Sequence, residues 1–198
     1  MSSSSKVLDK TMLLLAITLI TVPLSGGVEC PNVENATFDA ESRDAVVNRH
    51  NELRSTLAFG TAVYKGGELL RSGKNIYQLR WDCDLEKLAQ GWADKKVFQH
   101  SPQAYRQAGE NIFQSFKSGN IGTVAQNAVA ATNAWWAELK KYNASSNVDN
   151  KFTGDAFSVA GHWTQQAWGA TRQIGCGVSM FRKEPWNTAL VVCLYRAQ

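Results

Sequence analysis

The sequence predicts a single α+β domain in which helices cover a small antiparallel sheet. With 198 residues, of which 44% are hydrophobic and 19% charged, the chain can bury one substantial core. Stretches with apolar residues at every third or fourth position alternate with short strand-like runs, and no long linker separates them. An antiparallel sheet with helices packed against it needs no long connection, so this order of elements favours the α+β class.

The first 27 residues predict a secretory signal peptide. Lys6 and Lys10 precede the apolar stretch 12–24, and small residues follow it up to Gly27. This stretch is shorter than the ~20 residues that a membrane span needs, which favours cleavage after Gly27 over a membrane anchor. No later segment is long and apolar enough to span a bilayer. We therefore expect an extracellular, secreted product with one domain over residues 28–198.

Helices are expected in four places. Asp39 can cap a helix that ends near Leu57, and Asp84 can cap a second helix that carries apolar residues as far as Val97. Apolar residues at helical spacing predict a third helix over residues 124–142. A further helix-like segment, opened by His162, covers residues 161–168.

Strands are expected over residues 111–116, 174–181 and 190–195. The last two are joined by a turn-rich linker that contains Pro185. These strands would form the sheet that the helices cover.

Four cysteines form an even set without a close C-x-x-C pair, which favours two disulfides in an oxidising compartment. Cys176 and Cys193 lie on neighbouring strand-like runs and can face each other across a hairpin. Cys30 with Cys83 then remains. Four cysteines permit three pairings, and the sequence does not exclude the other two.

Asn35 and Asn143 each begin an Asn-X-Ser/Thr sequence and are therefore candidate glycosylation sites of a secreted glycoprotein.

The residues suited to chemistry are two histidines and two glutamates. His100 lies ten residues before Glu110, so that a loop can bring the two side chains together. His162 opens the helix-like segment, and Glu138 lies on the third predicted helix. Imidazole and carboxylate groups suit Zn²⁺ and similar divalent cations, although the spacing alone favours satisfied structural histidines.

Six sequence motifs, in this order, resemble the CAP superfamily of cysteine-rich secretory, venom allergen and pathogenesis-related proteins, and most closely its secreted single-domain members from nematodes. The resemblance covers residues 38–198. The motifs are His50–Arg54, Gln99–Pro102, Gly109–Ile112, Gly161–Gly169, Ile174–Gly177 and Val191–Tyr195.

The resemblance implies an α-β-α sandwich with a large open cleft. It also implies that His100, Glu110, Glu138 and His162 are the cleft tetrad, with zinc or another divalent cation as a conditional cofactor on the two histidines. His50 is then a structural histidine. Gln166 departs from the usually aliphatic residue of the motif, and we expect its amide, one helical turn after His162, to face the cleft.

Sterol or lipid binding is a second property that the resemblance implies, through an aromatic loop after the third helix. The matching stretch 142–157 keeps Tyr142, Phe152 and Phe157 but spreads them among polar residues. The alternative is a solvated loop with one or two rings in the core.

Three function classes follow. We favour a non-enzymatic secreted binding or effector protein, whose partner is an extracellular protein or a lipid or sterol ligand, present as a monomer or weak dimer. The alternatives are a metal-dependent hydrolase or protease and a purely structural extracellular scaffold. No nucleophile elbow or zincin motif supports the enzyme. The net charge is +4, but the basic residues form no dense run in the sequence, so nucleic acid is not an expected partner.

Overall fold

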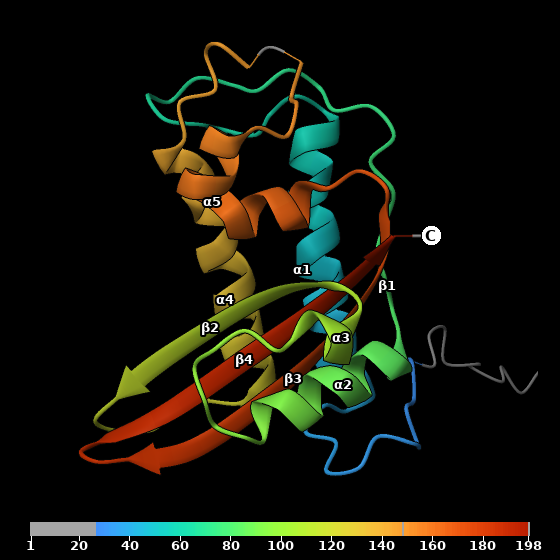
Figure 1. Cartoon of the computed structure of the whole chain (residues 1–198), viewed down its shortest axis with the longest axis vertical. Coiled ribbons are helices and arrows are strands. Elements are labelled where there is room, and N and C mark those ends of the chain that lie inside the picture. The colour runs from blue at the N-terminus through green and yellow to red at the C-terminus, as the bar shows by residue number, and fades with distance from the viewer. Residues whose placement is uncertain (1–26, 148, 198) are drawn as a thin grey trace, which may run out of the picture.

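A four-stranded sheet with helices on both faces forms the fold (Figure 1). The computed structural model describes residues 27–147 and 149–197, so that the predicted signal peptide lies outside the described residues apart from Gly27. Within the described part, no helix has both the length and the apolar character that crossing a membrane requires.

The sheet contains β1 (Arg80–Trp81), β2 (Gly109–Lys117), β3 (Thr171–Lys183) and β4 (Trp186–Ala197) in the order β1-β3-β4-β2. Strands β2, β3 and β4 pair antiparallel, as predicted, while the short edge strand β1 runs parallel to β3. The predicted strands are thus found, and β3 and β4 extend further than the sequence indicated because they pair with each other up to the turn at Lys183 and Trp186.

Helices α1 (Ala40–Ala58) and α4 (Val124–Ala137) cover one face of the sheet, and α2 (Cys83–Ala93) covers the other. Helix α5 (Gly154–Ala167) packs against α4 and α1 beyond the end of the sheet (Figure 1). The short helices α3 (Gln103–Arg106) and η1 (Glu138–Lys141) complete the fold. This arrangement confirms the predicted α+β class and its sandwich of helices around a small sheet.

Alternating side chains of the central strand β4 fill the two layers of the core. Val191, Cys193 and Tyr195 pack toward α1 and α4, whereas Leu190 and Leu194 pack toward α2. A strand buried on both faces has few polar positions, which is why this segment reads as a nearly continuous apolar run.

Two glycines of β3 allow α2 to lie directly on the sheet. A Cβ atom at Gly175 would overlap the backbone of Glu86, and one at Gly177 would overlap the backbone of Gln90. Cys176, between the two glycines, points to the opposite face. The Gly-Cys-Gly sequence therefore gives close helix contact on one face and a disulfide on the other.

Three predicted helix boundaries are wrong. Helix α2 is capped by Asp82, whose carboxylate accepts the backbone N–H of Leu85, and not by Asp84; it ends at Ala93 rather than Val97. Helix α5 begins at Gly154, well before His162. The cap of α1 at Asp39 agrees with the sequence, because Asp39 and Ser42 form a capping box.

Both favoured disulfides are present, Cys30–Cys83 and Cys176–Cys193. Cys176 and Cys193 are directly opposite each other on β3 and β4.

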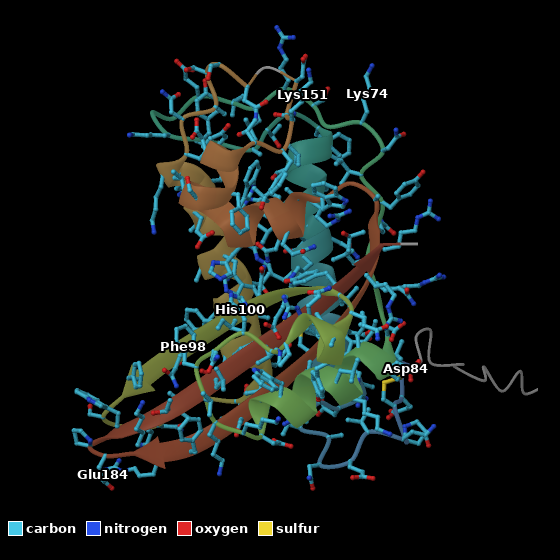
Figure 2. The ribbon with its side chains drawn as sticks, viewed as in Figure 1. Lys74, Asp84, Phe98, His100, Lys151 and Glu184 are labelled. Atoms are coloured by element: carbon cyan, nitrogen blue, oxygen red, sulfur yellow. A yellow bond between two sulfur atoms is a disulfide. The ribbon has the colours of Figure 1, made fainter. Side chains whose placement is uncertain are left out.

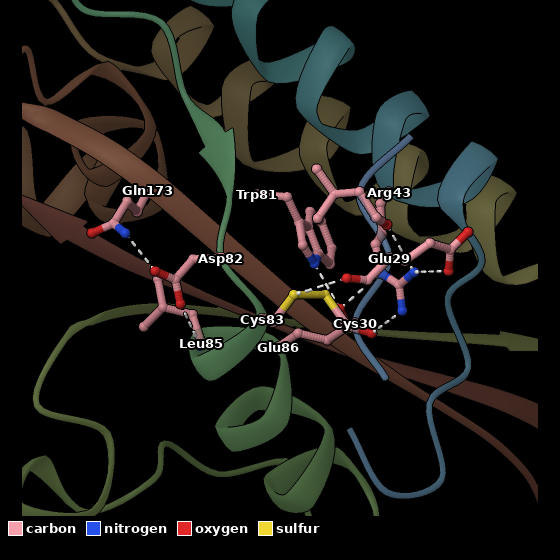
Figure 3. The surroundings of a disulfide bond; sticks show 10 residues. Glu29, Cys30, Arg43, Trp81, Asp82, Cys83, Leu85, Glu86 and Gln173 are labelled. Atoms are coloured by element: carbon pink, nitrogen blue, oxygen red, sulfur yellow. Dashed lines mark hydrogen bonds and ion pairs between the residues drawn. A yellow bond between two sulfur atoms is a disulfide. The ribbon is translucent and has the colours of Figure 1, made fainter. Parts of the chain in front are cut away.

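The Cys30–Cys83 disulfide ties the N-terminal segment to the start of α2. Beside it, Figure 3 shows the Arg43 guanidinium pairing with both carboxylate oxygens of Glu86, at 2.8 and 2.9 Å. Trp81 also donates to Glu86. Because the buried carboxylate is paired and hydrogen-bonded, it joins α1, α2 and β1 without an uncompensated charge.

The predicted glycosylation sites Asn35 and Asn143 are both exposed, which is the access that a glycan requires.

We predict that Gly177→Ala lowers the free energy of unfolding by about 1 to 3 kcal/mol, because the added methyl group must push α2 away from β3. Urea unfolding followed by circular dichroism measures the change. The matched control is Gly119→Ala, where nothing lies within 4 Å of the new methyl group. Equal stability of the two variants would contradict the close contact.

Candidate functional site

His100 and Glu110 form the first imidazole–carboxylate pair of the site. Nδ1 of His100 lies 2.7 Å from Oε1 of Glu110, at the start of β2. The same carboxylate accepts the backbone N–H and the hydroxyl of Ser101, at 2.9 and 2.6 Å. The Glu110 side chain is fully buried while the His100 ring is 55% exposed. The carboxylate therefore fixes both the ring and the loop that carries it.

His162 and Glu138 form the second pair. Nδ1 of His162 lies 2.8 Å from Oε1 of Glu138. Oε2 of Glu138 accepts the backbone N–H groups of His162, at 3.0 Å, and Trp163, at 3.4 Å. These N–H groups follow Ala160, where α5 departs from helical geometry. Glu138 thus caps the second half of the kinked helix and also orients the imidazole of His162.

This double role keeps Glu138 ionised. Burial raises its pKa, but the hydrogen bonds from the His162 ring and from the backbone of Trp163 and His162 outweigh burial and hold the pKa below its usual value.

All four predicted site residues line one cavity of about 920 Å³ between β2, α3, η1 and α5. His100 lies in the middle of the molecule, between the sheet and the upper helices (Figure 2). Other lining residues are the exposed aromatic side chains Phe152, Phe157 and Trp168 and the polar side chains Gln103, Arg106 and Gln165.

The structure brings the tetrad together as two pairs rather than as one closed cluster. Among the described residues, the one group of three possible metal ligands whose donor atoms all lie within 4.8 Å of one another is Cys30, Cys83 and Glu86, and its sulfurs are joined in a disulfide. Nε2 of His100 and of His162 has no hydrogen-bond partner in the described part of the chain. Each ring therefore keeps one nitrogen available for a ligand.

Asn111 and Tyr195 stand behind the His162 side of the cavity, and the sequence analysis did not single them out. The Asn111 amide donates to the carbonyl of His162, at 3.0 Å, and lies 3.4 Å from the Tyr195 hydroxyl. Asn111 directly follows Glu110, so adjacent residues of β2 hold the two halves of the site. Asn111 lies within the Gly109–Ile112 motif and Tyr195 ends the Val191–Tyr195 motif, and these motifs were the available signal.

The Tyr195 hydroxyl is also hydrogen-bonded to His50 in the core. Nδ1 of His50 donates to the carbonyl of Val46, so Nε2 accepts the hydrogen bond from Tyr195 at 3.0 Å. Burial lowers the pKa of His50 to about 4 and raises that of Tyr195. His50 is therefore neutral, and its buried place in this network agrees with a structural role.

Gln166 does not face the cleft. Its side chain is 1% exposed, and its amide donates to the carbonyl of Thr132 in α4 and lies beside the Tyr195 hydroxyl. The expectation from helical spacing is wrong because the second half of α5 turns this residue toward α4 and the core.

Arg54 fixes the end of α5 that follows His162. The guanidinium is buried and donates to the carbonyls of Gln166 and Trp168, at 2.6 and 2.9 Å. Further bonds reach the carbonyls of Tyr77, Gly169 and Thr171. Burial lowers the pKa of Arg54 to about 10, which leaves it charged at neutral pH. The cation therefore satisfies the carbonyls at the helix C-terminus and complements their dipole.

A second cavity of about 790 Å³ lies next to the first, on the other side of Phe152 and Trp168, which line both. Its lining includes the buried side chains of Tyr142 and Trp163; among the described residues the Trp163 indole N–H, itself buried, has no hydrogen-bond partner. Of the aromatic residues expected in the 142–157 loop, Tyr142 is therefore in the core, and Phe152 and Phe157 are exposed.

Comparisons with known proteins agree with the geometry. The sequence profile of CAP, the cysteine-rich secretory protein family, matches residues 47–195. Venom allergen 5.02 of Dolichovespula maculata is 31% identical over 161 residues, which cover 78% of this chain and 71% of the relative. Venom allergen 3 of Solenopsis invicta is 31% identical over 174 residues, which cover 85% of this chain and 73% of the relative.

Two solved structures at 34% identity resemble this chain. BmVAL-1 has a TM-score of 0.75 and covers 86% of this chain and 82% of its own. NaASP2, crystallised with Zn²⁺, has a TM-score of 0.72, and the match covers 82% of this chain and 83% of the NaASP2 chain.

We predict that His50 makes stability depend on pH between about 4 and 6.5. The folded protein holds this ring neutral, whereas the unfolded chain protonates it below the ordinary pKa of 6.5. The contribution of the neutral His50 ring to the free energy of unfolding is therefore complete above pH 6.5 and falls by about 3 kcal/mol as the pH drops to about 4. Urea unfolding of wild type and His50→Gln across this range measures it. A constant difference between the two proteins would contradict the prediction.

Proposed function

The chain belongs to the cysteine-rich secretory protein (CAP) family, and from this premise we propose that it is a secreted binding protein whose cleft holds a divalent metal ion on His100 and His162. Its two disulfides suit the oxidising extracellular compartment, as does the predicted signal peptide.

The observation that carries the metal site is the state of the two imidazoles. Each donates Nδ1–H to a buried or half-buried carboxylate and leaves Nε2 free. A carboxylate behind the imidazole is the usual support of a metal-binding histidine, because it fixes the tautomer and the ring orientation. Glu110 and Glu138 are therefore the supporting groups, and the two Nε2 atoms are the ligands.

Zinc is the favoured ion. Neutral imidazole nitrogen suits Zn²⁺, and the related structure of NaASP2 contains Zn²⁺. With two ligands from the protein, a bound zinc ion would supply open coordination positions to a donor atom of a ligand in the cleft.

Binding is favoured over hydrolysis because neither carboxylate is free to act as a general base. Glu110 accepts three hydrogen bonds from His100 and Ser101, and Glu138 holds the His162 ring and the backbone after the kink. A purely structural network is disfavoured by the 55% exposure of the His100 ring at a large cavity.

We predict saturable zinc binding by the wild type and its loss in the double variant His100→Ala/His162→Ala, measured by isothermal titration calorimetry. Glu138→Gln should weaken zinc binding by about 10- to 100-fold, because the amide is a poorer acceptor for the His162 ring.

The matched control is Glu52→Gln, which neutralises an exposed carboxylate of α1 outside the cleft and should leave zinc affinity unchanged. Equal zinc binding by wild type and the double variant would overturn the metal site. Turnover of a peptide library by the zinc-loaded protein would favour the enzyme instead.

The second cavity supports a second function, the binding of a sterol or lipid. Leu57, Leu70 and Ile76 supply apolar walls, and Tyr142 and Trp163 add aromatic rings to the lining. Apolar walls with aromatic rings favour a ligand with a large apolar body, because its burial removes apolar surface from water. A sterol has this chemistry.

We predict saturable uptake of labelled cholesterol in a sedimentation assay, and an affinity about 2- to 10-fold lower for Ile76→Ser, which replaces an apolar wall of the cavity by a polar side chain. Val97→Ser, which makes an exposed apolar residue outside this cavity polar, is the control. Absence of saturable uptake by the wild type would reject sterol binding.

A further inference from the structure

Helix α2 leaves one end of the sheet uncovered. It runs beside β3 from Ile174, whose carbonyl accepts the backbone N–H of Asp82, past Gly177, where the helix backbone touches the strand. The helix ends at Ala93, but β3 continues to Lys183 before the chain turns into β4. The face that α2 covers therefore extends beyond the helix that protects it (Figure 1).

Aromatic side chains occupy this uncovered end. Phe116, Thr188 and Phe181 stand directly opposite one another on β2, β4 and β3, so they share one face. Packing of Phe181 with the α2 layer identifies that face. Trp186 lies two residues from Thr188 and therefore points the same way.

These rings are accessible, unlike those of the core. Phe116 is 48% exposed and Trp186 44% exposed. Phe181, the third ring on this face, is partly buried against the α2 layer.

Lysines surround the rings. Lys96 lies with Nζ 5.8 Å from the centre of the Phe181 ring, and Lys183 stands opposite Trp186 in the hairpin. Neither lysine has an ion pair within the described part of the chain, while the acidic Glu184 of the turn is paired with Arg182. The uncovered end therefore combines exposed rings with unpaired positive charge.

We propose that this end of the sheet, formed by Lys96, Phe116, Phe181, Lys183 and Trp186, docks on membranes that carry anionic lipid headgroups. Trp and Phe rings insert at the boundary between headgroups and acyl chains, and lysines are attracted to acidic headgroups at the surface. A second copy of the chain fits less well, because a symmetric contact would bring the lysines of both copies together. The docking surface lies apart from the metal cleft and the second cavity, so it holds or fails independently of either.

The test is cosedimentation of the full mature chain with vesicles of phosphatidylcholine alone or of phosphatidylcholine with phosphatidylserine. We expect binding to the mixed vesicles, weakening as salt rises, and little binding to phosphatidylcholine alone. Lys96→Glu/Lys183→Glu should weaken binding by at least about tenfold, because it reverses the charge beside the rings. Trp186→Ser should weaken binding to the mixed vesicles without changing how binding depends on salt, because it removes a ring and no charge.

Two control variants separate this surface from general stickiness. Phe59→Ser removes a ring that is 79% exposed at the end of α1, and Lys140→Glu reverses an exposed charge on η1. Both should bind vesicles as the wild type does. Circular dichroism verifies that each variant is folded.

Docking would be overturned by absence of binding to the mixed vesicles, or by equal loss in the control variants. It would also be overturned if Trp186→Ser changed the molar mass in solution and left vesicle binding intact, which would identify the surface as an interface between copies. Binding to soluble heparin that the double lysine variant abolishes, without vesicle binding, would assign the surface to polyanions instead.

Discussion

The buried guanidinium of Arg54 is the interaction on which the upper half of the molecule depends. An isolated buried charge is strongly unfavourable, and no carboxylate of the described residues pairs with this one. It is satisfied instead by backbone carbonyls at the end of α5 and in the segments around Tyr77 and Thr171. One rigid cation on α1 donates hydrogen bonds to carbonyls of three other segments. These bonds fix the positions of α1, α5 and the start of β3 relative to one another. His162 takes its position within this arrangement.

The two carboxylates of the site apply the same principle on a smaller scale. Glu110 and Glu138 each hold an imidazole through one ring nitrogen and the backbone of the same segment through an N–H group. Ring and main chain are therefore fixed together, and the kink at Ala160 supplies the free N–H groups that Glu138 needs. Such a site loses little entropy when it binds a ligand, which favours recognition by preorganised donors.

The surfaces that carry the proposed functions lie where the layers of the sandwich end. The cleft and the second cavity flank α5, which packs beyond the sheet, and the aromatic, lysine-bearing end of the sheet extends past α2. The middle of the sheet, by contrast, is covered on both faces by helices. Binding surfaces at the margins leave this core undisturbed, so that the fold and the sites can vary separately.

The sequence by itself determined those features that depend on neighbours along the chain. The period of apolar residues identified the main helices and strands, Asp39 marked the start of α1, and the hairpin spacing favoured the Cys176–Cys193 disulfide. The resemblance to a family added the four site residues, which spacing alone did not support. Tertiary structure alone decided that Glu138 caps a kinked helix, that Gln166 turns into the core and that Asn111 holds the carbonyl of His162. These features join residues far apart in sequence, and their energies exist only once packing has removed water and brought the partners together.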